Sequence, residues 1–250
     1  MNAPASPGII PPRSGGPVDP KAIDDLVAAN RILADQGVLD GYGHCSIRHP
    51  TAPDRYFLSR SLSPAIVTAA DIIEFDLDSN PVNQNGRRMY LERFIHGEIY
   101  KARPDVNAVV HTHSPTVIPF GVSTVKLQPI CHMSAFLGPG VPNFEIREAA
   151  GMTDLLIRDD KLGAALARTL NGYDVCLMRG HGNVCVGPDI VTAVYRAVYT
   201  EVNAKLQAQA IALGGPVTYL AEGEWEAIVN RGDKNFDRPW LMWKSRISTT

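Results

Sequence analysis

The sequence predicts an α/β domain in which short strands alternate with helices. Apolar residues recur at helical spacing in several segments, the longest of which runs from Pro188 to about Leu213. Short apolar, β-prone runs lie between these segments and are bounded by turn residues. The chain has 250 residues, 45% of them hydrophobic, which is enough for one sizeable domain with a full core.

The domain is expected to begin after an N-terminal tail. Residues 1–18 contain five prolines and three glycines, and such a segment buries too little apolar area to offset the entropy of ordering. We therefore expect a flexible tail there. Asp19 and Pro20 form a helix N-cap followed by proline at the first helical position, and helical spacing continues to Gly37. A single domain is expected over residues 19–250.

The remaining elements continue the alternation of strands and helices. We expect strands at Cys45–Arg48, Tyr56–Ser59 and Ile72–Asp76, a brief helix opened by Ser63-Pro64, a helix from Leu91 to Pro104, a strand at Val106–Thr112, a helix at Lys161–Leu170, strands at Asp174–Met178 and Val184–Val186, and the long helix. Trp225, Trp240 and Trp243 follow in the last forty residues. These indoles are expected to pack on the domain or on a neighbouring subunit.

Charge and composition exclude several classes of protein. Lys+Arg 24 against Asp+Glu 26 gives a net charge of −2, and no basic block is present, which disfavours a nucleic-acid partner. No apolar run approaches the roughly 18 residues that a membrane helix needs, and the N-terminus lacks a signal-peptide pattern. The 4 cysteines form no CxxC pair and are expected to be reduced and mostly buried. We therefore expect a cytoplasmic protein.

Two histidines mark the end of one predicted strand. His111 and His113 are two residues apart, so their imidazoles leave the same face of the strand and can converge on one ion. His181 stands between Gly180 and Gly182 after another strand, where the glycines allow close backbone approach. Hydrogen-bonded core histidines and an exposed turn histidine are the alternatives.

A carboxylate completes this candidate set. Glu92 opens the helix that precedes the His111 strand, a position that the helix dipole also explains. Three neutral imidazoles and one carboxylate suit a divalent transition metal with one position open or exchangeable for substrate. Zinc, manganese, iron and cobalt all fit such a set.

These motifs resemble those of a known superfamily. Glu92, His111-x-His113 nineteen residues later and Gly-His181-Gly resemble the four metal ligands of the class II aldolase/adducin superfamily, and the stretch Gly43–Arg48 resembles its substrate loop. The resemblance covers roughly residues 22 to 215. It implies a three-layer α/β/α, class II aldolase-like domain with a mainly antiparallel central sheet. It also implies a homotetramer with the metal site at the subunit boundary, and one divalent ion per subunit, with Zn2+ favoured over Mn2+ or Fe2+.

The departures from the sugar-phosphate aldolases are informative. Their phosphate-binding asparagine, Thr-Gly pair and paired serines correspond to His44, Ser61-Leu62 and Tyr90-Leu91 here. Bulk and an aromatic ring replace small donors, so a phosphorylated sugar is a poor candidate. The aldolase tyrosine that donates a proton corresponds to His132, whose imidazole is able to take the same role near neutral pH.

Other motifs resemble one branch of the superfamily. These motifs are Leu58–Ser61, Glu92–Tyr100 and His132–Phe136. They are similar to decarboxylases that act on compounds of the type 3,4-dihydroxyphthalate or 2-hydroxy-3-carboxymuconate semialdehyde in aromatic catabolism. Iron-dependent oxygenases of prenylated hydroxybenzoates lie near the same branch.

This resemblance implies a metal-dependent decarboxylase. Losing CO2 leaves two electrons on carbon, and a neighbouring metal-bound oxygen is able to accept them as an enolate or phenolate. In this reading Glu92, His111, His113 and His181 hold the metal, and Glu92 is also a candidate for proton transfer if substrate displaces it. His132 is the expected proton donor to carbon. The substrate is a small carboxylic acid.

Three further residues, His44, Ser59 and Arg60, are expected to bind substrate. Arg60, beside Ser59 after a predicted strand, is able to make a bidentate contact with a retained carboxylate, although a surface role is an alternative. His44 is expected to bind substrate or to cap its own loop. His96 lies one turn after Glu92, where it orients that carboxylate or packs in the core.

Competing functions remain open at this point. They are an aldolase or epimerase of an unphosphorylated hydroxy-carbonyl compound, a non-haem iron oxygenase, and a non-catalytic adducin-like module. Retention of all four ligand-type residues argues against the last, because a scaffold has no need of an open metal site.

Overall fold

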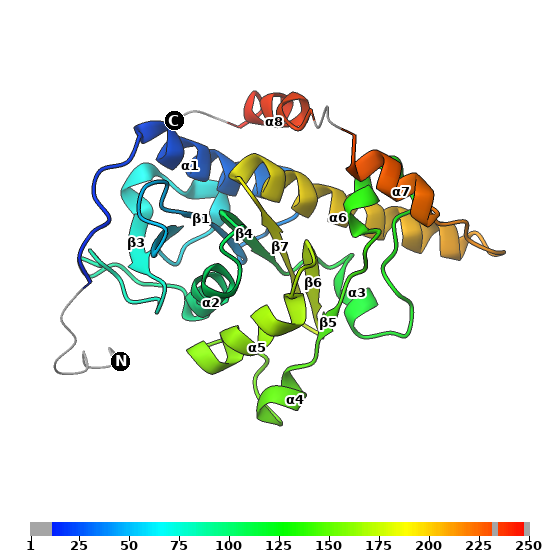
Figure 1. Cartoon of the computed structure of the whole chain (residues 1–250), viewed down its shortest axis with the longest axis horizontal. Coiled ribbons are helices and arrows are strands. Elements are labelled where there is room, and N and C mark those ends of the chain that lie inside the picture. Colours follow the sequence, from blue (N-terminus) through cyan, green and yellow to red (C-terminus); the bar gives the residue numbers. More distant parts are fainter. Residues whose placement is uncertain (1–11, 232–234, 248–250) are drawn as a thin grey trace.

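A computed structural model describes residues 12–231 and 235–247 of the chain (Figure 1). Its centre is one 7-stranded sheet in the order β3-β2-β1-β4-β7-β6-β5. The strands are β1 (His44–Arg48), β2 (Arg55–Ser59), β3 (Ile72–Asp76), β4 (Ala108–Thr112), β5 (Asn143–Phe144), β6 (Val175–Met178) and β7 (Gly182–Gly187). All neighbouring strands pair antiparallel except β5 and β6, which are parallel. The expected mainly antiparallel sheet is confirmed.

Helices cover both faces of this sheet. The α-helices are α1 (Pro20–Asp35), α2 (Phe94–Ala102), α3 (Ile118–Gly121), α4 (Ile146–Ala150), α5 (Asp160–Leu170), α6 (Ile190–Ala212), α7 (Glu222–Val229) and α8 (Asp237–Lys244). Short 3-10 helices are η1 (Pro64–Ile66), η2 (Ala69–Asp71), η3 (Leu91–Arg93) and η4 (His132–Leu137). In Figure 1, α1, α6 and α8 lie above the sheet and α2 and α5 below it. The α/β class and the three-layer arrangement are therefore as expected.

The strands divide the apolar side chains between two cores. One core lies between the sheet and α1 and α6, and the other lies between the sheet and α2 and α5. On β4, Ala108 and Val110 pack in the first core, whereas Val109 packs in the second. The same alternation along β7 separates Cys185 from Val184. Because successive residues of a strand point to opposite faces of the sheet, a strand that is covered on both faces needs apolar residues at nearly every position. This explains why the strand that carries His111 reads as a continuous apolar run.

Most expected elements occur within a residue or two of their predicted bounds. Seven short elements were not expected from the sequence: α3, α4, α7, α8, β5, η2 and η4. These elements are two to eight residues long, too short to show a periodic apolar pattern. Their positions depend on contacts with the larger elements.

The tail differs from the expectation over its described part. Residues 1–11 lie outside the described residues, but Ser14 and Gly15 contact the sheet. Ser14 Oγ donates to Glu74 Oε2 at 2.7 Å, and the Gly15 N–H donates to Glu74 Oε1 at 2.6 Å. A carboxylate on β3 thus binds a segment that cannot order itself by apolar burial, so the boundary expected at residue 19 is too late.

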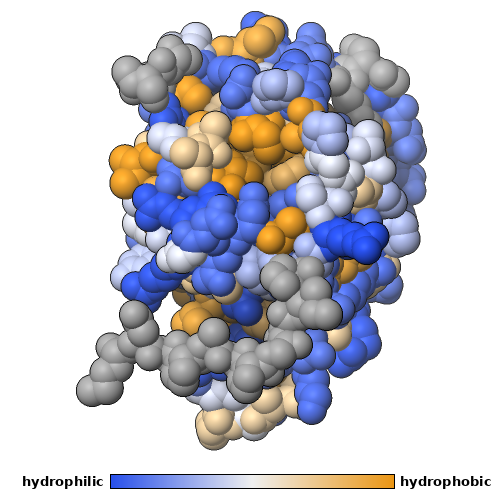
Figure 2. Space-filling model, turned by 90° about the vertical axis from the view of Figure 1, so that its left-hand side faces the viewer, coloured by the Kyte–Doolittle hydropathy of each residue, from blue (hydrophilic) through white to orange (hydrophobic). Residues whose placement is uncertain are grey.

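The C-terminal tryptophans pack within the chain. Trp240 and Trp243 on α8 are buried in the core that α1 and α6 cover, and Trp225 on α7 packs against Gly138. All 4 cysteines are free and three of them are buried, as expected. The face drawn in Figure 2 shows apolar surface bordered by hydrophilic side chains. Within residues 12–231 and 235–247, no helix is both long and apolar enough to cross a bilayer.

Candidate metal centre

The four predicted ligands come together from three parts of the sheet and its helices. His111 lies on β4 and His113 follows the end of that strand, while His181 lies in the turn between β6 and β7. Glu92 lies in η3, directly before α2. Because β4 and β7 pair along their length, the turn that carries His181 is next to the end of β4. One ligand atom from each residue lies within 4.8 Å of the others.

The distances show imidazole nitrogens facing one another. His113 Nε2 is 3.0 Å from His111 Nε2 and 2.9 Å from His181 Nε2. Glu92 Oε2 is 3.4 Å from His181 Nε2 and 3.6 Å from His111 Nε2. These atoms converge on one point rather than forming separate pairs.

Backbone carbonyls determine which nitrogen of each imidazole faces the centre. His111 Nδ1 lies 3.2 Å from the Asn183 carbonyl oxygen, and His181 Nδ1 lies 3.0 Å from the Leu155 carbonyl oxygen. A carbonyl only accepts, so Nδ1 of each ring carries the donated proton, and Nε2 is the nitrogen left to present a lone pair to a metal. His113 has at most one Nε2–H to share, so at least one of the N···N contacts joins two lone pairs. A divalent cation relieves this repulsion, and the donor set fits one.

Burial and neighbouring charges favour the protonation states in which these side chains bind a metal. Burial lowers the pKa of His113 to about 4, helped by the nearby charges of His111 and His181, so this imidazole is neutral near pH 7. Burial also lowers the pKa of His111. Burial opposes ionisation of Glu92, but His111 and His181 outweigh it and hold the pKa of that carboxyl well below its ordinary value. Neutral imidazoles and an ionised carboxylate are the forms that bind metal.

Glycines allow the His181 turn to reach the centre. A Cβ on Gly182 would lie 1.8 Å from the Thr112 carbonyl oxygen, so no other residue fits this close approach of β7 to β4. Gly180 has φ +67, a left-handed conformation that glycine adopts without strain. The tight Gly-His-Gly turn is therefore a geometric requirement.

Glu92 is held by a contact that the sequence did not indicate. The Ile157 N–H donates to Glu92 Oε1 at 2.9 Å, which leaves Oε2 to face the histidines. Ile157 and Leu155 belong to an irregular segment before α5, and their contacts with Glu92 and His181 are made by backbone atoms. Backbone groups carry no residue-type signal, so sequence reasoning had no means to find them.

His44 lies beside the candidate ligands without joining them. It pairs with His111 across β1 and β4, and the two ring centroids are 5.1 Å apart. The ring of Tyr90 lies 4.4 Å from that of His44. His96 contacts His44 rather than Glu92, so the expected orientation of Glu92 by His96 is not present.

Ser59 and Arg60, the other two predicted substrate-binding residues, both contact other residues of the chain. Ser59 is fully buried, and its Oγ lies 3.4 Å from Tyr90 Oη, which also donates to the Leu62 carbonyl oxygen at 2.6 Å. Ser59 thus lies behind the Tyr90 hydroxyl, and its role in binding substrate stays a prediction. Arg60 Nε is paired with Asp71 Oδ1 at 2.6 Å. The role of Arg60 in binding substrate stays a prediction.

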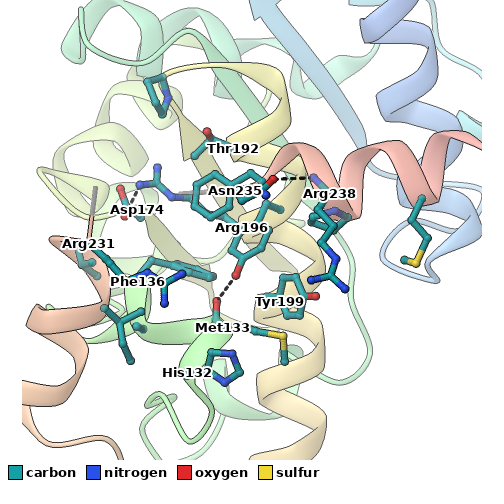
Figure 3. Close-up of a pocket in the computed structure, with 18 residues that line it drawn as sticks. His132, Met133, Phe136, Asp174, Thr192, Arg196, Tyr199, Arg231, Asn235 and Arg238 are labelled. Carbon is teal, nitrogen blue, oxygen red and sulfur yellow. Dashed lines mark hydrogen bonds and ion pairs between the residues drawn. The ribbon is translucent and has the colours of Figure 1, made fainter. Parts of the chain in front are cut away.

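His132 lies away from the ligand cluster within one chain. Figure 3 shows it on η4 at a cavity of about 850 Å³ that also has Met133, Phe136 and Tyr199 in its wall. The cavity lies between η4, α6 and the C-terminal helices, and its lining includes none of Glu92, His111, His113 and His181. His132 is exposed. The role of His132 as proton donor stays a prediction.

The fold and the Glu/His3 cluster together define a class II aldolase type of domain. The chain belongs to the family described as the Class II Aldolase and Adducin N-terminal domain, which matches residues 24–208. It is 38% identical over 272 residues to decarboxylase tropJ of Talaromyces stipitatus, covering 100% of this chain and 97% of that protein.

Two further comparisons agree with this membership. The 3,4-dihydroxyphthalate decarboxylase of Arthrobacter keyseri is 30% identical over 243 residues, covering 91% of this chain and 94% of that protein. The crystal structure of an aldolase II superfamily protein from Pseudomonas syringae superposes with a TM-score of 0.78 at 23% identity, over 92% of this chain and 94% of that one. The fold is therefore that of class II aldolases, and relatives that span nearly the whole chain are named decarboxylases.

Proposed function

We propose that this protein is a divalent-metal-dependent decarboxylase of a hydroxylated aromatic or muconate-type carboxylic acid in aromatic catabolism. The observation that carries the proposal is the convergence of one carboxylate and three imidazole atoms within 4.8 Å. The decarboxylase names of the two relatives support the reaction type.

Each member of the cluster has a defined role in this proposal. Glu92, His111, His113 and His181 would hold the ion. When bound, it would act as a Lewis acid that stabilises negative charge developing on a substrate oxygen. The carbonyls of Asn183 and Leu155 hold two of the imidazoles in their ligand tautomers, so the chain itself sets the geometry. Zn2+ is favoured, and Mn2+ or Fe2+ would also suit this donor set.

Apolar surface near the cluster supports an aromatic substrate. Tyr42 is 70% exposed and its ring centroid is 6.2 Å from that of His113. Leu91, next to Glu92, is 58% exposed. Val122 and Leu155 lie near Gly180, just before His181. A planar ring bound at the metal would bury these side chains and exclude water from the reacting carbon.

Proton delivery requires a second subunit in this proposal. His132 is exposed on η4 and absent from its own chain's cluster, so we assign it as the donor that protonates carbon at a neighbouring centre. This assignment agrees with the proposed homotetramer. The four free cysteines support a cytoplasmic location.

The test combines metal analysis with a CO2-release screen. Protein purified without added metal is analysed for its elements, then loaded with Zn2+, Mn2+ or Fe2+ and assayed anaerobically against ortho-hydroxy aromatic diacids. Release of CO2 that stops on chelation is expected. His49→Gln, which changes a buried histidine stacked on Phe57 away from the cluster, controls for nonspecific effects and keeps its metal. A substrate-dependent product that forms only with O2 would instead indicate the oxygenase, and cleavage to an aldehyde would indicate the aldolase or epimerase class.

A further inference from the structure

A continuous chain of polar side chains crosses the apolar layer between the sheet and α2. His44 Nδ1 lies 2.6 Å from His96 Nε2, and His96 Nδ1 lies 2.6 Å from Ser46 Oγ. Ser46 Oγ in turn lies 2.7 Å from Tyr100 Oη. His44 is 3% exposed and the other three are 1% exposed or less. The surrounding core contains Ile95 and Ile99, so each polar group here depends on its neighbours in the chain.

The local structure explains why these four residues meet. His44 and Ser46 are two residues apart on β1, so both side chains leave the same face of the sheet. His96 and Tyr100 are four residues apart on α2 and lie one above the other on the helix face that packs on that side. The two pairs therefore meet side by side, with His96 between the two strand residues.

Counting protons fixes the direction of every hydrogen bond. Burial lowers the pKa of His96 to about 3, so its imidazole is neutral and carries a single proton, although both of its nitrogens are in contact with a polar neighbour. If the Tyr100 hydroxyl donates to Ser46, Ser46 donates to His96 Nδ1 and His96 Nε2–H donates to His44 Nδ1, all three protons inside the chain have acceptors, and only the Nε2–H of His44, at the end of the chain, is left to bond outside it. In the opposite direction, His44 Nδ1–H donates to His96 and His96 Nδ1–H donates to Ser46. Only one of the two hydroxyl protons of Ser46 and Tyr100 then has an acceptor among the described residues. An unsatisfied buried donor is costly, so the first direction prevails.

This direction places the proton of His44 on Nε2. No described residue bonds to Nε2, and this nitrogen is not one of the fully buried side-chain atoms that lack a partner. The small exposed surface of His44 therefore includes Nε2. The ring of His44 lies 4.4 Å from that of Tyr90 and 5.1 Å from that of the ligand-type His111, and its Nδ1 contacts His96 on α2. His44 is thus a neutral hydrogen-bond donor beside the metal centre.

We propose that His44 Nε2–H donates a hydrogen bond to an anionic oxygen of the substrate, and that His96, Ser46 and Tyr100 are positioning residues that hold His44 in this donor tautomer. The inference rests on the proposed function for the identity of the site. It restricts the substrate to one that presents an acceptor oxygen, a carboxylate or an ionised phenol, next to the oxygens that the metal holds. A hydroxyl that must donate at this position is not accommodated, because Nε2–H has no free lone pair.

The test uses binding as well as turnover, so that it does not depend on the proposed reaction. Calorimetry measures the affinity of the Zn2+-loaded enzyme for 3,4-dihydroxybenzoate, an ortho-dihydroxy aromatic acid. His44→Leu is expected to weaken binding roughly 10- to 100-fold, the range for losing a hydrogen bond to a charged group, with metal content unchanged. His44→Gln, which keeps an N–H at the same reach, is expected to stay within a few-fold of the unchanged enzyme. Equal affinity of the Leu variant and the unchanged enzyme overturns the contact, and so does equal loss in both variants.

The positioning residues are tested separately. Ser46→Ala removes the hydroxyl that fixes the direction, so both tautomers of His44 become populated and binding should weaken roughly two- to tenfold. Thr200→Val removes another fully buried hydroxyl, one that donates to the Arg196 carbonyl on α6, and should leave binding unchanged. Ser46→Ala with unaltered affinity overturns the positioning role. Absence of CO2 release with all these binding results intact would refute the proposed reaction and leave this inference standing.

Discussion

The buried His96 predicts a specific acid sensitivity of the fold. Its pKa is about 3 in the folded chain because of burial, against an ordinary value of 6.5. The folded pKa is below the unfolded one, so the unfolded chain binds the proton first as the pH falls. The stability from His96 is fully present above pH 6.5 and is lost as the pH falls toward 3. At pH 5 this histidine alone costs about 2 kcal/mol of the free energy of unfolding, relative to pH 8.

Urea unfolding at pH 8, 6 and 5 measures this cost. In His96→Gln the same drop in pH should cost about 2 kcal/mol less than in the unchanged protein, whatever the variant's stability at pH 8. Groups elsewhere titrate in both proteins and cancel in the comparison. His132→Gln, at an exposed position, controls for the loss of one histidine. If the pH profiles of the unchanged protein and His96→Gln run parallel, His96 is not held neutral by burial and the reasoning fails.

Four further predictions follow from the site and its supports. His111→Ala or His113→Ala should lose metal and activity while far-UV circular dichroism stays unchanged, and full metal occupancy in either would contradict the ligand assignment. His132→Ala and His132→Gln should lower kcat on the order of 10²- to 10⁴-fold with KM nearly unchanged, whereas a raised KM at normal kcat would point to substrate binding instead. Gly182→Ala should lower the free energy of unfolding by on the order of 3 kcal/mol in urea titrations, because the new methyl meets the Thr112 carbonyl. Light scattering at micromolar concentration should give a tetramer, and a monomer near 27 kDa would refute the shared site.

The ligand set shows how far sequence reasoning reached and where it stopped. His111-x-His113, the Gly-His181-Gly turn and Glu92 were identified from residue types and spacing, and the structure brings them together. The surroundings of Ser59 were beyond the reach of sequence spacing. Its burial and its contact with Tyr90, 31 residues later in the chain, arise from tertiary packing.

His96 illustrates the same limit within one helix. Helical spacing correctly placed it on the face of Glu92, but η3 ends in a kink at Glu92, where φ is −90 and ψ is 17. The two side chains therefore do not follow one regular helix, and His96 contacts β1 instead. A local pattern does not report such a kink.

By itself, the sequence determined the longer elements, their apolar faces and the residue types at the candidate metal centre, because these depend on periodicity and on chemistry local to each segment. Only the tertiary structure decided which backbone carbonyls orient the imidazoles, that Ser14 and Gly15 attach to Glu74, and that His44, Ser46, His96 and Tyr100 form one chain. Those contacts join residues 26 to 72 positions apart, from the link between His181 and Leu155 to that between His111 and Asn183. They arise from the pairing of strands and the packing of helices, and no short stretch of sequence encodes them.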